Sequence, residues 1–165
     1  MKLLQSAPFL VAARWWGYLV GLLVALQPLA QLAARIMITD VFWKSGLTKL
    51  RDWDITLALF HDEYHVPLLS PDVAAYLGTA GELLLPALLL PGLAGRFAAL
   101  GLSVVNVMAA LSLGSGIAEA ALQQHVFWGS LLAMLALWGP GIWSLDHLLG
   151  RRYGAQLRAA AALPR

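Results

Sequence analysis

Long apolar stretches are the feature that most limits what this chain can fold into. Only 12% of its 165 residues are charged and 60% are hydrophobic, with a mean hydropathy of +0.72. Soluble domains carry about 25% charged residues. In lipid, backbone groups must be paired within the protein, and about 20 apolar residues suffice for one helical crossing. The sequence therefore predicts an all-α polytopic membrane protein with a four-helix bundle.

Three of the four predicted spans have clear limits. Ser70-Pro71-Asp72 is typical of a helix start, because a cap, a proline in the first turn and an early carboxylate all favour one. Glycine and proline then end each stretch. The predicted spans cover about residues 71–90, 97–113 and 122–138.

The N-terminal third is harder to divide, because residues 9–50 are too long for one span and too short for two. We interpret residues 9–26 as an interfacial helix or a helical extension, with Trp15, Trp16 and Tyr18 at the headgroups. Pro28 predicts a kink or break, so the first span covers about 28–47. The expected organisation is an amphipathic interfacial segment (1–27), the membrane domain (28–150) and a basic, Ala-rich tail (151–165). A short surface helix is expected at 144–152.

Charge asymmetry predicts the orientation of the bundle. With four spans, most Lys and Arg outside the spans share the side of the two termini, whereas acidic residues dilute the basic ones in the 51–70 connection. The positive-inside rule then places both termini in the cytoplasm and the 51–70 connection on the other side of the membrane. We expect the N-terminus to be retained, because no convincing signal-peptide cleavage site follows it.

Charges inside the apolar stretches are the first candidates for a site, because a charge in hydrocarbon is costly and usually faces a bundle interior. Asp40 and Lys44 lie one helical turn apart and can neutralise each other. Arg35 lies on another side of the same helix. We expect Glu82 to be its partner, since Glu82 lies on a stripe of small residues and at a similar estimated depth. Such a pair can fix packing, or it can handle protons, a quinone or a substrate.

Two further polar residues are candidates. Asn106 shares a face with small residues of the third span, which is more typical of helix–helix contact than of a ligand site. His125 begins the fourth span and can titrate or hydrogen-bond a quinone carbonyl. His61 and His65 have the spacing of a metal-binding pair, but no third ligand is fixed, and we predict no metal site.

Composition also bounds the chemistry. The chain has no Cys, which excludes thiol redox chemistry, an iron–sulfur cluster and a thiolate metal site within it. A net charge of only +2 gives no support to a nucleic-acid partner. We expect that the chain carries no cofactor of its own. The small molecules that it is expected to bind are a quinone or a lipid. The partners considered are the lipid bilayer, a redox protein and a second copy of the chain.

Several motifs occur together between residues 28 and 150. They are an Arg before the apolar half-span, FWKSGLTKL, the pattern F-x-x-E-Y-x-V-P-L-L and a mid-membrane Glu, followed by G-L-x-x-R. On these motifs the chain resembles the DoxX family of bacterial membrane proteins. The ending GPGIWSLDHL resembles one DoxX subgroup, whereas SGIAEAALQQHVFW departs from that subgroup's pattern. The resemblance implies a four-helix inner-membrane bundle linked to redox or oxidative-stress systems, with one distant branch associated with quinone-coupled thiosulfate oxidation. On the matching pattern it carries over these core or site positions: Arg35, Lys44, Gly46, Lys49 and Glu82.

The sequence thus favours a redox-linked membrane protein that binds a quinone or docks a redox partner. The alternative is a non-catalytic anchor, scaffold or small-solute carrier that uses the same charges for packing or proton coupling. Whether the chain is itself an enzyme stays open.

Overall fold

The computed structural model describes residues 7–161, with the side chains of residues 7, 8, 115, 155 and 157–161 left aside. The outermost parts of the predicted N-terminal segment and of the tail therefore lie outside the described residues. All described regular structure is helical: α1 (Ala7–Arg51), α2 (Trp53–Asp62), α3 (Pro71–Leu89), α4 (Gly95–Ser112), the short 3₁₀ turn η2 (Gly114–Gly116), α5 (Glu119–Trp138) and α6 (Leu145–Ala161). Four of these helices, α1, α3, α4 and α5, are long and apolar enough to cross a membrane, which confirms the predicted fold class.

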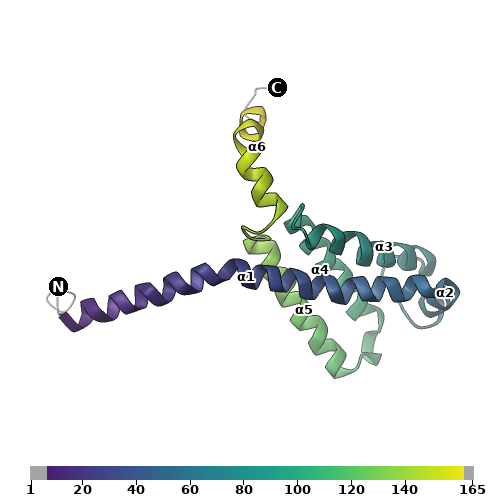
Figure 1. The fold of residues 1–165 in the computed structure, drawn as a ribbon. Coiled ribbons are helices and arrows are strands. Elements are labelled where there is room, and N and C mark those ends of the chain that lie inside the picture. Colours follow the sequence, from purple (N-terminus) through teal and green to yellow (C-terminus); the bar gives the residue numbers. More distant parts are fainter. Residues whose placement is uncertain (1–6, 162–165) are drawn as a thin grey trace.

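The bundle is built from the C-terminal half of α1 together with α3, α4 and α5 (Figure 1). The most extensive contacts are those of α4 with α5 and of α1 with α3. The common core contains Ile38 and Phe42 of α1, Leu89 of α3, Leu102 of α4 and Leu132 of α5, all buried. The predicted limits of the second, third and fourth spans agree with α3, α4 and α5 to within a few residues.

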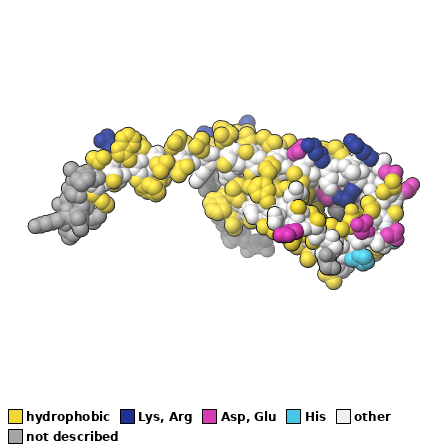
Figure 2. All heavy atoms as spheres, turned by 90° about the horizontal axis from the view of Figure 1, so that it is seen from below, with side chains coloured by type: hydrophobic (Ala, Val, Ile, Leu, Met, Phe, Trp, Pro, Cys, Tyr) yellow, Lys and Arg dark blue, Asp and Glu magenta, His cyan; other side chains and the backbone are white. Residues whose placement is uncertain are grey.

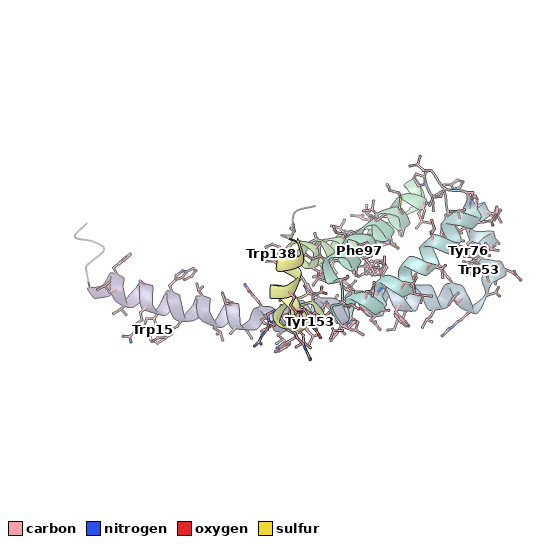
Figure 3. The ribbon with its side chains drawn as sticks, turned by 90° about the horizontal axis from the view of Figure 1, so that it is seen from above. Trp15, Trp53, Tyr76, Phe97, Trp138 and Tyr153 are labelled. Atoms are coloured by element: carbon pink, nitrogen blue, oxygen red, sulfur yellow. The ribbon has the colours of Figure 1, made fainter. Side chains whose placement is uncertain are left out.

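Of the kink or break predicted at Pro28, the break was wrong, because α1 continues through this residue, and the kink stays a prediction. Residues 9–26 form an extension that leaves the bundle (Figure 1), as the alternative interpretation expected. Their side chains are exposed on every side, among them Trp15, which Figure 3 shows far from the bundle. The interfacial position of this extension stays a prediction.

The helix α2 within the 51–70 connection was not predicted. Asp52 caps it, since a side-chain oxygen of Asp52 accepts a hydrogen bond from the backbone N–H of Ile55 at 3.1 Å. Phe60 of α2 packs on Ala74 and Ala75 of α3. The rings of Trp53 and Tyr76 lie with their centroids 4.8 Å apart at this end of the bundle (Figure 3). We call it the α2 end.

The opposite end, which we call the Arg35 end, gathers the α3–α4 and α5–α6 turns. Asp146 of α6 binds the start of α4, because its two carboxylate oxygens accept hydrogen bonds from the backbone N–H groups of Ala94 and Gly95, each at 2.7 Å. Such an anion at a helix N-terminus is favoured by the helix dipole. The contact fixes the beginning of α6, which is longer than the surface helix predicted at 144–152.

Candidate functional site

Arg35 is a clamp between two turns and does not contact Glu82. Its side chain is buried, with Nη1 donating to the carbonyl of Leu90 at 2.9 Å and Nη2 donating to the carbonyl of Trp143 at 2.5 Å. Leu90 is the C-terminal cap of α3, where unpaired carbonyls and the negative end of the helix dipole favour a cation. The predicted Arg35–Glu82 pair was therefore wrong.

The helix register explains this correction. A Cβ built on Gly46 would lie 3.2 Å from Cβ of Glu82, so Gly46, and not Arg35, is level with Glu82. Arg35 lies about 16 Å further along α1 at ~1.5 Å per residue. The sequence estimate assumed that α1 enters the bundle at Pro28, whereas Arg35 itself lies at the end of the bundle.

Gly92 gives the Arg35 clamp its space. This residue has a φ of +71°, and a Cβ on it would lie 2.6 Å from Nη1 of Arg35. The α3–α4 turn therefore needs glycine twice, for its left-handed backbone and for the close approach of the guanidinium.

The partner of Glu82 is Lys49. Nζ of Lys49 lies 2.5 Å from Oε2 of Glu82 and 3.2 Å from Oγ of Ser45. The Glu82 side chain is 7% exposed and that of Lys49 is 20% exposed, so the pair is largely withdrawn from solvent. From the sequence, Lys49 was a candidate only through the family resemblance. Lys49 and Arg51 are also what the last turn of an ordinary helix carries, so their positions alone do not indicate a site.

This ion pair borders a cavity of about 560 Å³ in the half of the bundle nearer the α2 end. The volume is within the range of about 300–1,000 Å³ that small-molecule sites occupy. Its wall is mostly apolar, and aromatic rings contribute a large part of it. The cavity-lining residues used below are Phe42, Ser45, Lys49, Phe60, Tyr64, Gly78, Glu82, Met108, Ala109, His125 and Trp128.

His125 reaches the same cavity from α5 and is held by Asn106 of α4. The amide nitrogen of Asn106 donates to the backbone carbonyl of His125 at 2.9 Å, so the amide oxygen is the atom that lies 2.8 Å from Nδ1 of His125. An oxygen acceptor there assigns the hydrogen to Nδ1 of the neutral ring and leaves Nε2 as an acceptor. Asn106 thus joins two helices, as predicted, and also orients His125.

Aromatic contacts limit the motion of the histidine ring. The rings of His125 and Trp128 meet edge to face with centroids 5.2 Å apart, and Trp128 meets Phe42 at 6.2 Å. This row of rings connects α5 to α1 across the wall of the cavity. It provides a flat apolar surface beside a single nitrogen acceptor, which suits a planar ligand that carries an oxygen.

Tyr64, in the segment after α2, closes part of the cavity. Burial raises the pKa of its phenol, and the nearby carboxylates of Glu63 and Glu82 raise this pKa further. The phenol is therefore neutral near pH 7 and able to donate a hydrogen bond. Its ring meets that of Phe60 edge to face at 5.2 Å. Nothing in the local sequence signals this role, since the α2–α3 segment is placed only by tertiary packing.

Asp40 and Lys44 form the predicted ion pair but lie away from the cavity. Nζ of Lys44 is 2.8 Å from Oδ2 of Asp40, and their side chains are 74% and 56% exposed, respectively. They lie on the outer face of α1. Of the six candidates from the sequence, the structure thus brings Glu82, His125 and Asn106 together and leaves Arg35, Asp40 and Lys44 apart.

A second, larger hollow of about 730 Å³ lies at the Arg35 end, beside Gln31, Arg96 and Asp146. Three of its polar groups already serve the turns: Gln31 donates to the carbonyl of Gly139, Arg96 donates to that of Leu137, and Asp146 accepts from the start of α4. It is therefore the weaker candidate site despite its size.

The two histidines of the 61–65 segment have separate partners. Nε2 of His61 lies 3.0 Å from Oδ1 of Asp72, and Nδ1 of His65 lies 3.0 Å from the carbonyl oxygen of Glu63. Within the described residues, no group of three or more potential ligands is placed to hold a metal ion.

Comparison with known proteins gives one match. The family described as DoxX matches residues 30–115, just over half of the chain, a range that includes Lys49, Glu82 and Asn106 and ends before His125. No curated protein and no solved structure matches the chain.

Proposed function

The chain belongs to the DoxX family, and from that premise we propose that it is a redox-linked membrane protein that binds a quinone in the cavity beside Lys49, Glu82 and His125. The observation that supports the proposal is the combination of an apolar, aromatic wall with polar groups from two sides. A quinone needs both, because its ring and tail are apolar and its two oxygens are hydrogen-bonding groups.

The polar groups suit the two oxidation states of such a ligand. Lys49 can donate a hydrogen bond to a ring carbonyl, and Tyr64 can do the same. Nε2 of His125 can accept a hydrogen bond from the O–H of the reduced quinol, while Asn106 keeps the hydrogen on Nδ1. We propose that the electrons are exchanged with a separate redox partner protein, since the chain has no thiol redox centre of its own.

Titration of the purified protein with a short-chain benzoquinone and a short-chain naphthoquinone tests this function. Binding should quench tryptophan fluorescence, and a Trp128→Phe variant should lose part of that signal. An isoprenoid alcohol of similar size, which lacks the ring carbonyls, should bind at least about tenfold more weakly, or ~1.4 kcal/mol.

A matched pair of variants locates the binding. Ala109 lines the cavity, whereas Val107 of the same helix is exposed on the outside. Ala109→Phe should fill the cavity and abolish the quench, and Val107→Phe should leave it unchanged. Equal binding by both variants would place the quinone elsewhere and refute this site.

We also propose that the Arg35 end is cytoplasmic and that the chain lies in a bacterial inner membrane, with both termini in the cytoplasm. The support is the charge asymmetry of the connections. A Ser70→Cys variant of this Cys-free chain tests it, since Ser70 is exposed at the α2 end. An impermeant maleimide should label intact cells from outside; labelling that requires access to the cytoplasm would reverse the orientation.

A further inference from the structure

The outer face of α1 has the sequence and the exposure of a helix-pairing seam. Beginning at Trp15, steps of alternately four and three residues along α1 select a single stripe of side chains, which we call one position of the repeat. The average step is 3.5 residues, the period of a coiled coil. Every residue at that position is exposed, and every one but Asp40 is apolar. The seam consists of Trp15, Leu19, Leu22, Leu26, Leu29, Ala33, Ile36, Asp40, Trp43, Leu47 and Leu50.

The opposite face of the same helix is the one that packs in the bundle. It carries Arg35, Ile38 and Phe42, all buried, with the same spacing. In the half of α1 that belongs to the bundle the two faces are therefore distinct, and no described part of the chain covers the outer one. Figure 2 shows hydrophobic side chains along the length of α1.

Lipid suffices to cover the leucines of this seam but not the ion pair that Asp40 of the seam forms with the adjacent Lys44. Gly46 is level with Glu82, inside the span of α3, and Lys44 is only about 3 Å away along the axis. Asp40 and Lys44 are flanked by exposed apolar residues such as Met37, Trp43 and Leu47. A carboxylate and an ammonium that face acyl chains are costly, so a protein surface at this position is favoured.

We propose that this surface is a second copy of the same chain, related by a two-fold axis along the membrane normal, with the two α1 helices parallel along the seam. The carboxylate of Asp40 and the ammonium of Lys44 lie 2.8 Å apart, so the two charged groups occupy nearly one depth. The two-fold axis brings both pairs to that depth in opposite sense, so that each carboxylate can also reach the partner's ammonium. This self-complementarity is what a two-fold interface requires. A single polar residue in an otherwise apolar seam also fixes the register of the two helices.

Cross-linking in native membranes tests the seam directly, because the chain has no Cys. An Ile36→Cys variant should form a disulfide-linked dimer on mild oxidation. Leu84→Cys is the matched control, since Leu84 is exposed on α3, outside the seam. A cross-link at Ile36 that is no stronger than that at Leu84, or a cross-link to another protein, would overturn the proposal.

Charge exchange tests the pairing independently. Asp40→Lys or Lys44→Asp alone brings four like charges together and should weaken dimerisation by about tenfold or more. The double variant Asp40→Lys/Lys44→Asp restores the pattern and should restore the dimer. Asp54→Lys, an exposed change on α2, is the control and should have no effect.

Helix content and thermal unfolding of each variant in detergent show whether it folds, since within one chain the exposed pair contributes little. Folded single variants that dimerise normally, or a folded double variant that remains monomeric, would refute the two-fold pairing. Neither readout depends on quinone binding.

Discussion

Each end of the bundle holds a cation largely withdrawn from solvent, but only the cation toward the α2 end, Lys49, lines a cavity; Arg35 lines neither of the two hollows. At the Arg35 end the guanidinium is bound by two backbone carbonyls of the turns that it joins. Toward the α2 end the ammonium of Lys49 is bound by Glu82 and both line a cavity of about 560 Å³. A charge inside a membrane helix is thus insufficient evidence of a site; Lys49 differs from Arg35 because it borders unfilled, mostly apolar space.

The largest effect of a substitution on stability is expected at the Arg35 end. Arg35→Met should lower the free energy of unfolding by up to roughly 2–6 kcal/mol, because it leaves two partly buried carbonyls without their partner at ~1–3 kcal/mol each. The surviving folded protein should bind quinone normally, since Arg35 does not line the cavity. Thermal unfolding in detergent and binding to the folded fraction measure the two effects.

Arg96→Met is the control for this change. Arg96 is exposed and makes one longer hydrogen bond, of 3.3 Å, to the carbonyl of Leu137. Its replacement should alter stability by less than about 1 kcal/mol. Comparable losses in both variants would show that the Arg35 clamp has no special role.

A smaller loss of stability is expected at the cavity. Glu82→Ala leaves the ammonium of Lys49 without its partner, but that side chain is one-fifth exposed, so the cost should be near 1–3 kcal/mol. Glu82→Gln retains an acceptor for Lys49 and should cost less. Chemical denaturation of both variants distinguishes them, and identical curves would mean that the carboxylate is solvated and unpaired.

The smallest effect concerns Asn106, which we propose to act through His125. Asn106→Leu removes the acceptor that holds the hydrogen on Nδ1 and should weaken quinol binding by about tenfold, or ~1.4 kcal/mol. His125→Ala should weaken it at least as much. Because both changes remove the same interaction, that of His125 with the quinol, the double variant should bind no worse than His125→Ala alone. Additive losses of affinity would separate the two residues.

The sequence predicts where the helices of this protein begin and end better than it predicts which side chains of different helices come into contact. Pro71, Gly139 and the apolar runs set the limits of α3, α4 and α5 locally, so those predictions hold to within a few residues. The break considered at Pro28 is absent, because α1 tolerates a proline in its interior. Residues 9–26 remain helical beyond it, so proline alone does not fix where a membrane helix ends.

The contacts between helices depend on register, which no local pattern contains. The pair Asp40–Lys44 was predictable because it lies within one helix. Lys49–Glu82 and Asn106–His125 each join two helices, and an error in where α1 enters the bundle was enough to assign Glu82 to Arg35. Tyr64 reaches the cavity only because the segment after α2 folds back over α3, which the sequence does not signal.

The most direct test of the account replaces the whole Lys49–Glu82 pair by Lys49→Met together with Glu82→Leu. Apolar replacement of a complete buried ion pair is often neutral or stabilising, so the double variant should stay monodisperse and thermally stable. It should nevertheless bind the short-chain quinone at least about tenfold more weakly, since the loss of one donor to the ligand costs ~1.4 kcal/mol or more. A stable double variant with unchanged quinone affinity would contradict the account and assign this pair, like Arg35, to the framework of the bundle.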